Sequence, residues 1–252
     1  MRNKGRILWS VLGVAALGLL AGRCAPSVPK GAKKAAGAVS DAAVAAQKTY
    51  VAPGDLDEYY LFSSGGHSGQ IYVYGVPSMR HLSTIPVFSP YPATGYGFDD
   101  DSRAMLGSNL TWGDAHHPAL SETNGDYDGR WLFINDMNGR IARIDLRDFK
   151  TKQILGPIPN VSGNHSGAFV TPNTDYAMMG SRFSIPIPKG TVAPIEKYAT
   201  DYTGVLVGIK SEHNSGEMSM GWQIAMPPFD YDLGDAGKGP SDGWMFWTSY
   251  NA

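Results

Sequence analysis

Two adjacent histidines, His116 and His117, follow Asp114 in the stretch TWGDAHHPAL, and the whole chain has only six histidines. Imidazole nitrogens bind transition metals, and a carboxylate can orient such a ring by accepting its second N–H. Neighbouring side chains point to opposite faces in a strand and splay by about 100° in a helix. Neither geometry aims both rings at one small ion. The pair therefore suits a larger cluster, or else a surface turn with two solvated histidines.

Pro118 disfavours helical backbone at His117, so we expect the pair on irregular or extended backbone. Farther along, His165 lies between Gly163 and Gly167, and flanking glycines allow close backbone approach. His165 is either a third ligand or an ordinary turn histidine. The other three histidines are interpreted as solvated: His67, His81 and His213. The acidic run at 99–101 lacks the alternating spacing of a calcium loop and is interpreted as a solvated turn.

The composition favours an all-β protein with many turns. Charged residues make up 17% of the chain, and glycine (31) and proline (17) are abundant. A net charge of -2 provides no broad basic surface, which argues against nucleic acid as a partner. Cys24 is the only cysteine, so internal disulfides and cysteine-based metal sites are excluded. Any metal must be held by histidine, carboxylate or thioether groups.

The N-terminus is typical of an export signal. Arg2, Lys4 and Arg6 precede an apolar run over Ile7–Leu20 that is short for a membrane span. We expect a signal peptide at residues 1–25, the general secretory route and a periplasmic location. An uncleaved membrane anchor is the alternative.

Residues 26–54 are rich in Ala and Lys and are interpreted as a linker, with a weak helix near Ala35–Lys48. Just before it, the letters LLAGRC resemble a lipoprotein box. Arg23 stands where a small residue is expected, so lipidation at Cys24 is only weakly indicated.

Residues 55–252 contain an internal repeat. Each copy predicts an aromatic-led strand, a turn, an alternating strand, a polar turn and a third strand. The first copy predicts strands at Tyr60–Phe62, Gln70–Val76 and His81–Phe88. The second predicts Trp131–Phe133, Arg140–Leu146 and Lys152–Ile158. A looser third has Tyr176–Met178, Thr203–Ile209 and Trp222–Met226, and a fourth starts at Trp244–Phe246.

Repeated antiparallel units of this kind are the signature of a β-propeller, whose blades cover each other's faces. A β-sandwich would have no reason to repeat the pattern. Propellers usually need at least four blades to close, and this sequence supplies about three. We therefore expect the chain to be a fragment of a longer propeller protein.

The chain resembles the nitrous-oxide reductases over about Asp57 to Ala252, on GDAHHPAL, YDGRWLFIND, SGQIYVYGVPSM, IPVF and NHSG. The resemblance implies a seven-bladed propeller followed by a C-terminal cupredoxin domain, which is absent here. It implies reduction of nitrous oxide to dinitrogen and water at a tetranuclear copper–sulfide cluster. His116, His117 and His165 map to copper ligands, three of seven, and Asp114 maps to the aspartate beside the cluster. Tyr250 maps to a calcium ligand.

Further expectations follow from the same resemblance. Electrons would come from a binuclear copper centre in the missing cupredoxin domain, within a head-to-tail homodimer. A periplasmic c-type cytochrome or cupredoxin would supply them. The chain departs from the family at Ala119, where a further histidine is often found. It also lacks the twin-arginine signal, which matches the subgroup exported by the general secretory route. We expect the fragment alone to be inactive.

Two other classes of function remain open on the residues. One is a non-catalytic periplasmic propeller that acts as a binding or scaffold module. The other is a calcium-dependent propeller hydrolase, which would want Glu, Asn and Asp at its axis instead of an adjacent histidine pair.

Overall fold

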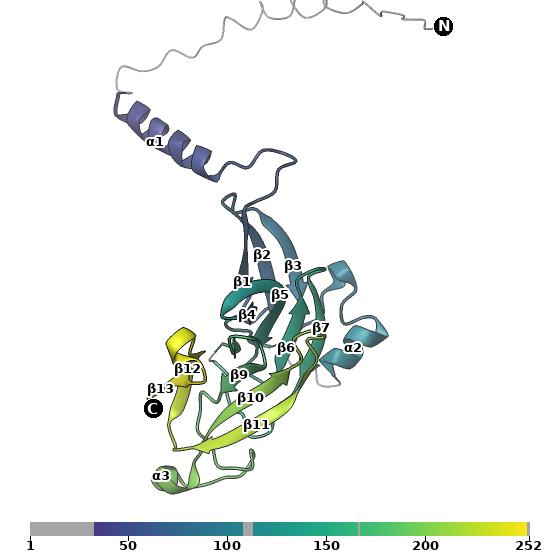
Figure 1. Ribbon diagram of the computed structural model, residues 1–252, viewed down its shortest axis with the longest axis vertical. Helices are drawn as coiled ribbons and strands as arrows, with labels where there is room; N and C mark the ends of the chain where they lie inside the picture. The colour runs from purple at the N-terminus through teal and green to yellow at the C-terminus, as the bar shows by residue number, and fades with distance from the viewer. Residues whose placement is uncertain (1–32, 108–112, 166, 251–252) are drawn as a thin grey trace, which may run out of the picture. The chain divides into compact units, whose positions relative to one another are not determined.

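The computed structural model of the chain (Figure 1) describes residues 33–107, 113–165 and 167–250. The predicted signal peptide and Cys24 lie outside this part. The chain divides into two compact units between Tyr50 and Val51. The predicted bounds of the linker and the propeller domain stay a prediction.

The first unit contains helix α1, Lys33–Thr49. Its sequence is alanine-rich, and alanine has the highest helix propensity of all residues. The sequence had suggested a weak helix over Ala35–Lys48, and the structure gives a slightly longer one. Within the described part of the chain, no helix combines the length and the apolar character needed to cross a membrane.

In the described residues, the second unit holds four antiparallel sheets, each with its strands in chain order. The first has β1 Tyr59–Ser64, β2 Gln70–Val76 and β3 His81–Pro86. The second has β4 Ala119–Thr123, β5 Asp126–Asn135, β6 Ile141–Asp145 and β7 Lys150–Leu155. The third has β8 Phe169–Val170, β9 Tyr176–Gly180, β10 Gly204–Ser211 and β11 Met218–Met226. The fourth pairs β12 Asp230–Ala236 with β13 Met245–Tyr250.

Short helical segments connect these strands. They are α2 Asp100–Leu106, α3 Tyr198–Asp201 and 3-10 turns at Pro92–Thr94, Ile195–Lys197 and Gly239–Ser241. The acidic run interpreted as a solvated turn is in fact the start of α2. Asp99 caps this helix, because its side chain accepts a hydrogen bond from the N–H of Ser102 at 2.9 Å.

Strand alternation explains why the sheets stack. On β5, Trp131 and Phe133 are buried in a core shared with β10 of the third sheet. The intervening Leu132 and Ile134 are buried in a second core shared with β2 and β3 of the first sheet. The second sheet is therefore covered on both faces, and each such side chain stabilises the fold by about 1.5–3 kcal/mol.

The first strands of successive sheets lie next to one another. β4 contacts β8, and β8 contacts β12. Antiparallel sheets that stack face to face, with their first strands adjacent, have the arrangement of propeller blades. The predicted fold class is thus confirmed, and the number of blades in the whole molecule stays a prediction.

Three strands were not predicted. β4 and β8 add a strand before the second and third repeat copies, and the fourth sheet begins at β12 instead of at Trp244. β12 contains three aspartates and a glycine, residues that are depleted in strands. Its pairing with β13 and its contacts with β8 and β9 outweigh that weak propensity.

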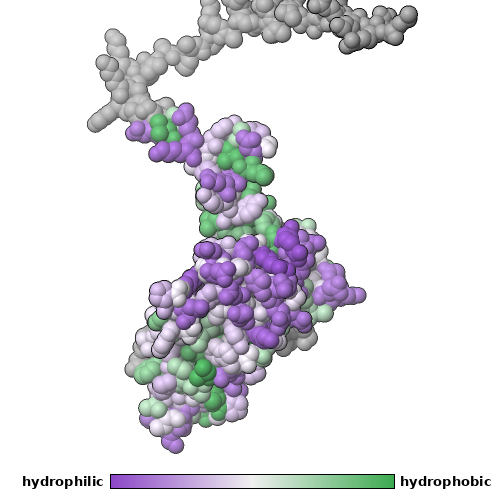
Figure 2. All heavy atoms as spheres, viewed as in Figure 1, coloured by the Kyte–Doolittle hydropathy of each residue, from purple (hydrophilic) through white to green (hydrophobic). Residues whose placement is uncertain are grey.

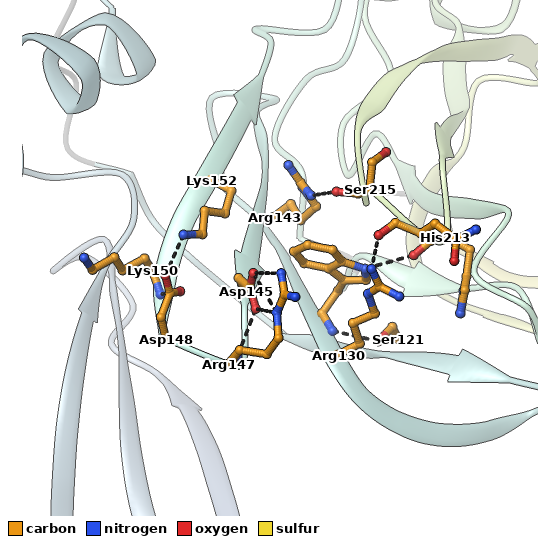
Figure 3. A network of polar contacts seen from close by, with 12 residues as sticks. Ser121, Arg130, Arg143, Asp145, Arg147, Asp148, Lys150, Lys152, His213 and Ser215 are labelled. Atoms are coloured by element: carbon orange, nitrogen blue, oxygen red, sulfur yellow. Dashed lines mark hydrogen bonds and ion pairs between the residues drawn. The ribbon is translucent and has the colours of Figure 1, made fainter.

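A polar clasp joins the second sheet to the turn between β10 and β11 (Figure 3). The indole N–H of Trp131 donates to the carbonyl of His213 at 3.2 Å. The guanidinium of Arg143 lies 4.5 Å from the centre of the Trp131 ring and donates to the carbonyl of Ser215. The His213 side chain is only partly exposed, at 35%, so the interpretation of this residue as simply solvated is wrong.

Apolar side chains remain exposed on the last three strands: Met220, Ile224, Leu233, Met245 and Phe246. Hydrophobic residues also show on the lower part of this unit in Figure 2. Exposed apolar surface of this kind is typical of a face that packs against another part of a protein or a partner.

Candidate metal centre

His116 and His117 lie on irregular backbone between Ala115 and the start of β4, as Pro118 predicted. Ala115 forms isolated antiparallel bridges with both Gly66 and Asp136. The segment is therefore held from two sides, by the β1–β2 turn and by the β5–β6 turn.

A buried ion pair supports the β5–β6 turn. Arg140 and Asp136 are almost fully buried, and their charged atoms lie 2.6 Å apart. The N–H of Arg140 also donates to the Asp136 carboxylate at 2.9 Å. A Cβ at Gly113 would lie 2.5 Å from the Cβ of Phe88 and 2.9 Å from the Asp136 carboxylate. Only glycine lets the backbone before the two histidines pass this close to the turn.

His165 lies on the loop between β7 and β8. Gly163 has φ +62, a conformation that glycine adopts without strain. A Cβ at Gly167 would lie only 2.9 Å from the Cβ of His117. The glycines that flank His165 thus allow its loop to approach the histidine pair, as their positions in the sequence suggested.

The three histidines that the sequence singled out converge. One potential ligand atom from each of His116, His117 and His165 can be chosen so that all lie within 4.8 Å of one another. The ring centres of His116 and His165 are 4.3 Å apart, and those of His117 and His165 are 5.8 Å apart. The cause is the fold, because β4 and β8 are adjacent and each ligand loop directly precedes one of them.

Asp114 lies beside this group. One carboxylate oxygen is 3.3 Å from Nε2 of His116, and the other is 3.6 Å from Nδ1 of His67. Nε2 of His116 is buried and has no hydrogen-bond partner in the described residues, so the contact with Asp114 is electrostatic. Asp114 does not accept an orienting hydrogen bond from His116 in this structure.

A second carboxylate, Asp232 on β12, was not found from the sequence. Its Oδ1 lies 2.6 Å from Nδ1 of His165. A carboxylate on one ring nitrogen holds the proton there and leaves the other nitrogen to bind a metal. The two residues are 67 positions apart, and β12 itself was not predicted, so no local pattern could have paired them.

Burial lowers the pKa of His116 below its usual range. The charges of His165 and His117 act in the same direction, while the Asp114 carboxylate opposes them. The neutral form of His116 is therefore favoured near neutral pH. A neutral imidazole is the form that binds metal ions.

Tyr250 lies at the end of β13, where its backbone pairs with Asp230. The calcium role of Tyr250 stays a prediction.

Fold and site together define a class of protein. It is an antiparallel, blade-built β-protein that gathers three imidazoles where the first strands of neighbouring sheets begin, with two carboxylates behind them. A donor set made of imidazole nitrogens is typical of copper, zinc, nickel and iron sites.

Sequence comparison with curated proteins shows which family within this class the chain resembles. The chain is 48% identical over 148 residues to a nitrous-oxide reductase of Pseudomonas fluorescens. The aligned region covers 57% of this chain and 23% of that protein. It is 35% identical over 237 residues to a nitrous-oxide reductase of Cupriavidus necator, with coverages of 84% and 35%. The resemblance seen in the sequence is thus confirmed, and the chain is homologous to part of the nitrous-oxide reductases. It spans between 23% and 35% of the length of these relatives.

No family model matches the chain. Among solved structures, it is similar to dihydro-heme d1 dehydrogenase NirN in complex with DHE, with a TM-score of 0.44 and 9% identity. That similarity covers 77% of this chain and 32% of the other.

Proposed function

We propose that this chain is part of a copper enzyme that reduces nitrous oxide to dinitrogen and water in denitrification. The observation that carries the proposal is the convergence of His116, His117 and His165, whose potential ligand atoms lie within 4.8 Å of one another. Homology to nitrous-oxide reductases supports it independently.

The residues present fit copper. Imidazole is a good ligand for this metal, which stands at the top of the affinity order of the divalent first-row ions. Nε2 of His116 is a buried nitrogen without a hydrogen-bond partner in the described residues. Asp232 engages Nδ1 of His165 and so leaves Nε2 of that ring for the metal. When bound, a reduced multicopper cluster would supply both electrons that nitrous oxide needs.

The histidines and the two aspartates of this chain would have different roles at the copper cluster. His116, His117 and His165 would hold copper, three of the seven histidines expected for the whole cluster. Asp232 would fix the orientation of His165, and Asp114 would place a negative charge beside His116. Since these are fewer than half of the expected ligands, we propose that the chain alone neither assembles the cluster nor reduces nitrous oxide.

The full-length protein would have further parts. It would be a periplasmic head-to-tail homodimer exported by the general secretory route, with calcium bound near Tyr250. A c-type cytochrome or cupredoxin would donate electrons through a binuclear copper centre in a separate cupredoxin domain. No observation on the described residues favours the scaffold or hydrolase alternatives over this reading.

The test uses the full-length protein with His116→Ala or His165→Ala, and His81→Ala as the matched control. His81 is an exposed histidine on β3, and its ring is hydrogen-bonded to the hydroxyl of Thr84. We expect the first two variants to lose copper and nitrous-oxide reduction while the control keeps both. Normal copper content and activity in either ligand variant would rule out that residue as a ligand.

A further inference from the structure

The turn between β1 and β2 lies against the segment that carries the histidine pair. The N–H of Ala115 donates to the carbonyl of Gly66 at 3.1 Å. The hydroxyl of Ser64 donates to the carbonyl of Ala115 at 2.6 Å. These bonds fix the position of His67, the residue after Gly66, relative to Asp114, the residue before Ala115.

The carboxylate of Asp114 lies between the exposed imidazole of His67 and the largely buried imidazole of His116. The side chain of His67 is 93% exposed, and its Nδ1 lies 3.6 Å from Oδ1 of Asp114. The other oxygen of Asp114 lies 3.3 Å from Nε2 of His116, whose side chain is only 19% exposed. Asp114 itself is 25% exposed, so exposure falls stepwise from His67 to His116.

An ion in solvent has poor access to the buried Nε2 of His116, whereas His67 and Asp114 can both be reached. One imidazole nitrogen and one carboxylate oxygen make a donor pair that copper accepts. The negative charge of Asp114 also attracts a cation to this edge of the centre. His67 does not belong to the three-histidine group, so a metal held by His67 would still have to move inward.

We propose that His67 and Asp114 form a capture pair, which takes a copper ion from solvent and passes it to His116. Asp114 bonds the ion first together with His67 and then releases it toward the three histidines, with no change in oxidation state. This assignment rests on the proposed function, because it requires that the three histidines bind copper.

The test measures copper loading of the full-length, metal-free protein with Cu²⁺ alone. A coloured chelator supplies the ion, and stopped-flow absorbance follows its transfer to the wild type, His67→Gln and His81→Gln. His81 provides the matched control because it is an exposed histidine on another strand. Thermal unfolding of the three metal-free proteins checks that the exposed substitutions leave the fold intact.

We expect His67→Gln to slow loading on the order of tenfold, within the range by which outer partners of metal sites alter binding. The final copper content should equal that of the wild type, and His81→Gln should load at the wild-type rate. Equal rates in all three proteins would overturn the capture role. A lower final content in His67→Gln would also overturn it, because His67 would then be a permanent ligand.

A second variant keeps the two proposals distinct. In His165→Ala, residual weak Cu²⁺ binding should remain and should disappear on adding His67→Gln but not on adding His81→Gln. Residual binding that is indifferent to His67 contradicts the capture pair alone. Absence of copper binding by the wild type itself would overturn the three-histidine centre, and the capture pair with it.

Discussion

Oδ1 of Asp232 lies 2.6 Å from Nδ1 of His165, although 67 positions separate them in the chain. The contact exists because β12 lies beside β8, directly after the loop that carries His165. One strand of the fourth sheet thereby fixes the ring of a candidate ligand from the loop before the third sheet.

Replacing Asp232 should weaken copper binding without unfolding the protein. Asp232→Ala removes the acceptor of the Nδ1–H, so the ring of His165 can rotate and change tautomer. We expect copper affinity to fall on the order of 10- to 100-fold, measured by competition with a chelator. Asp235→Asn, on an exposed residue of the same strand, is the control. Unchanged affinity in Asp232→Ala would show that the contact does not position the ligand.

Gly167 sets how closely the two ligand loops approach. In Gly167→Ala the new methyl group would lie 2.9 Å from the Cβ of His117, so one loop must move. We expect reduced copper content, together with a loss of stability of about 1–3 kcal/mol from overpacking.

Gly190→Ala separates these two effects. Gly190 lies between β9 and β10, has φ +102 and has no neighbouring atoms within 4 Å of the added Cβ, so this variant strains the backbone without displacing a ligand loop. It should lose some stability in chemical denaturation and keep its copper content. Normal copper content in Gly167→Ala would show that the loops carrying His117 and His165 can accommodate the added methyl group without disturbing the metal centre.

The clasp between the second and third sheets should contribute measurably to stability. Arg143 is buried, stacks on Trp131 and donates to the carbonyl of Ser215 (Figure 3). A hydrogen bond from a charged donor contributes about 1.5–3 kcal/mol, so Arg143→Ala should lower the free energy of unfolding by about that amount. Arg143→Lys should recover only part of it, because lysine lacks the planar stacking group. Wild-type stability in Arg143→Ala would show that the clasp is dispensable.

Asp145 makes part of the stability depend on pH. Hydrogen bonds from Arg147 lower the pKa of Asp145 from its ordinary value of 3.8 to about 2. Because the folded pKa is the lower one, the contribution is fully present above about pH 4. It is lost as the pH falls through about 2.

Arg147→Ala should therefore reduce the free energy of unfolding at pH 5 and have little effect at pH 2. NMR titration of the Asp145 carboxyl carbon should show its pKa rising toward 3.8. Lys150→Ala, an exposed cation at the start of β7, should leave that titration nearly unchanged. An equal loss of stability at both pH values would refute the ion-pair explanation.

The sequence predicted best the strands that bury at least one whole face. β2, β5, β6 and β10 carry alternating or continuous apolar residues, because neighbouring sheets cover them. β4, with Ser121 and Glu122 buried in it, and the aspartate-rich β12 gave no such pattern. Those strands depend on contacts with neighbours that no local window contains.

The candidate site was only partly predictable. Proline and glycine chemistry indicated irregular backbone at His117 and close approach at His165. The convergence of His165 with the pair depends on the adjacency of β4 and β8, and spacing alone left it open. From the sequence, only the resemblance to the nitrous-oxide reductases assigned His116, His117 and His165 to one metal centre. The contacts of Asp232 and His67 required coordinates.

The most direct measurement is copper-edge anomalous diffraction from crystals of the full-length protein purified with copper. We expect anomalous peaks within bonding distance of His116, His117 and Nε2 of His165, with the Asp232 carboxylate still in contact with Nδ1 of His165. Copper peaks elsewhere, with these three imidazoles free of metal, would contradict it.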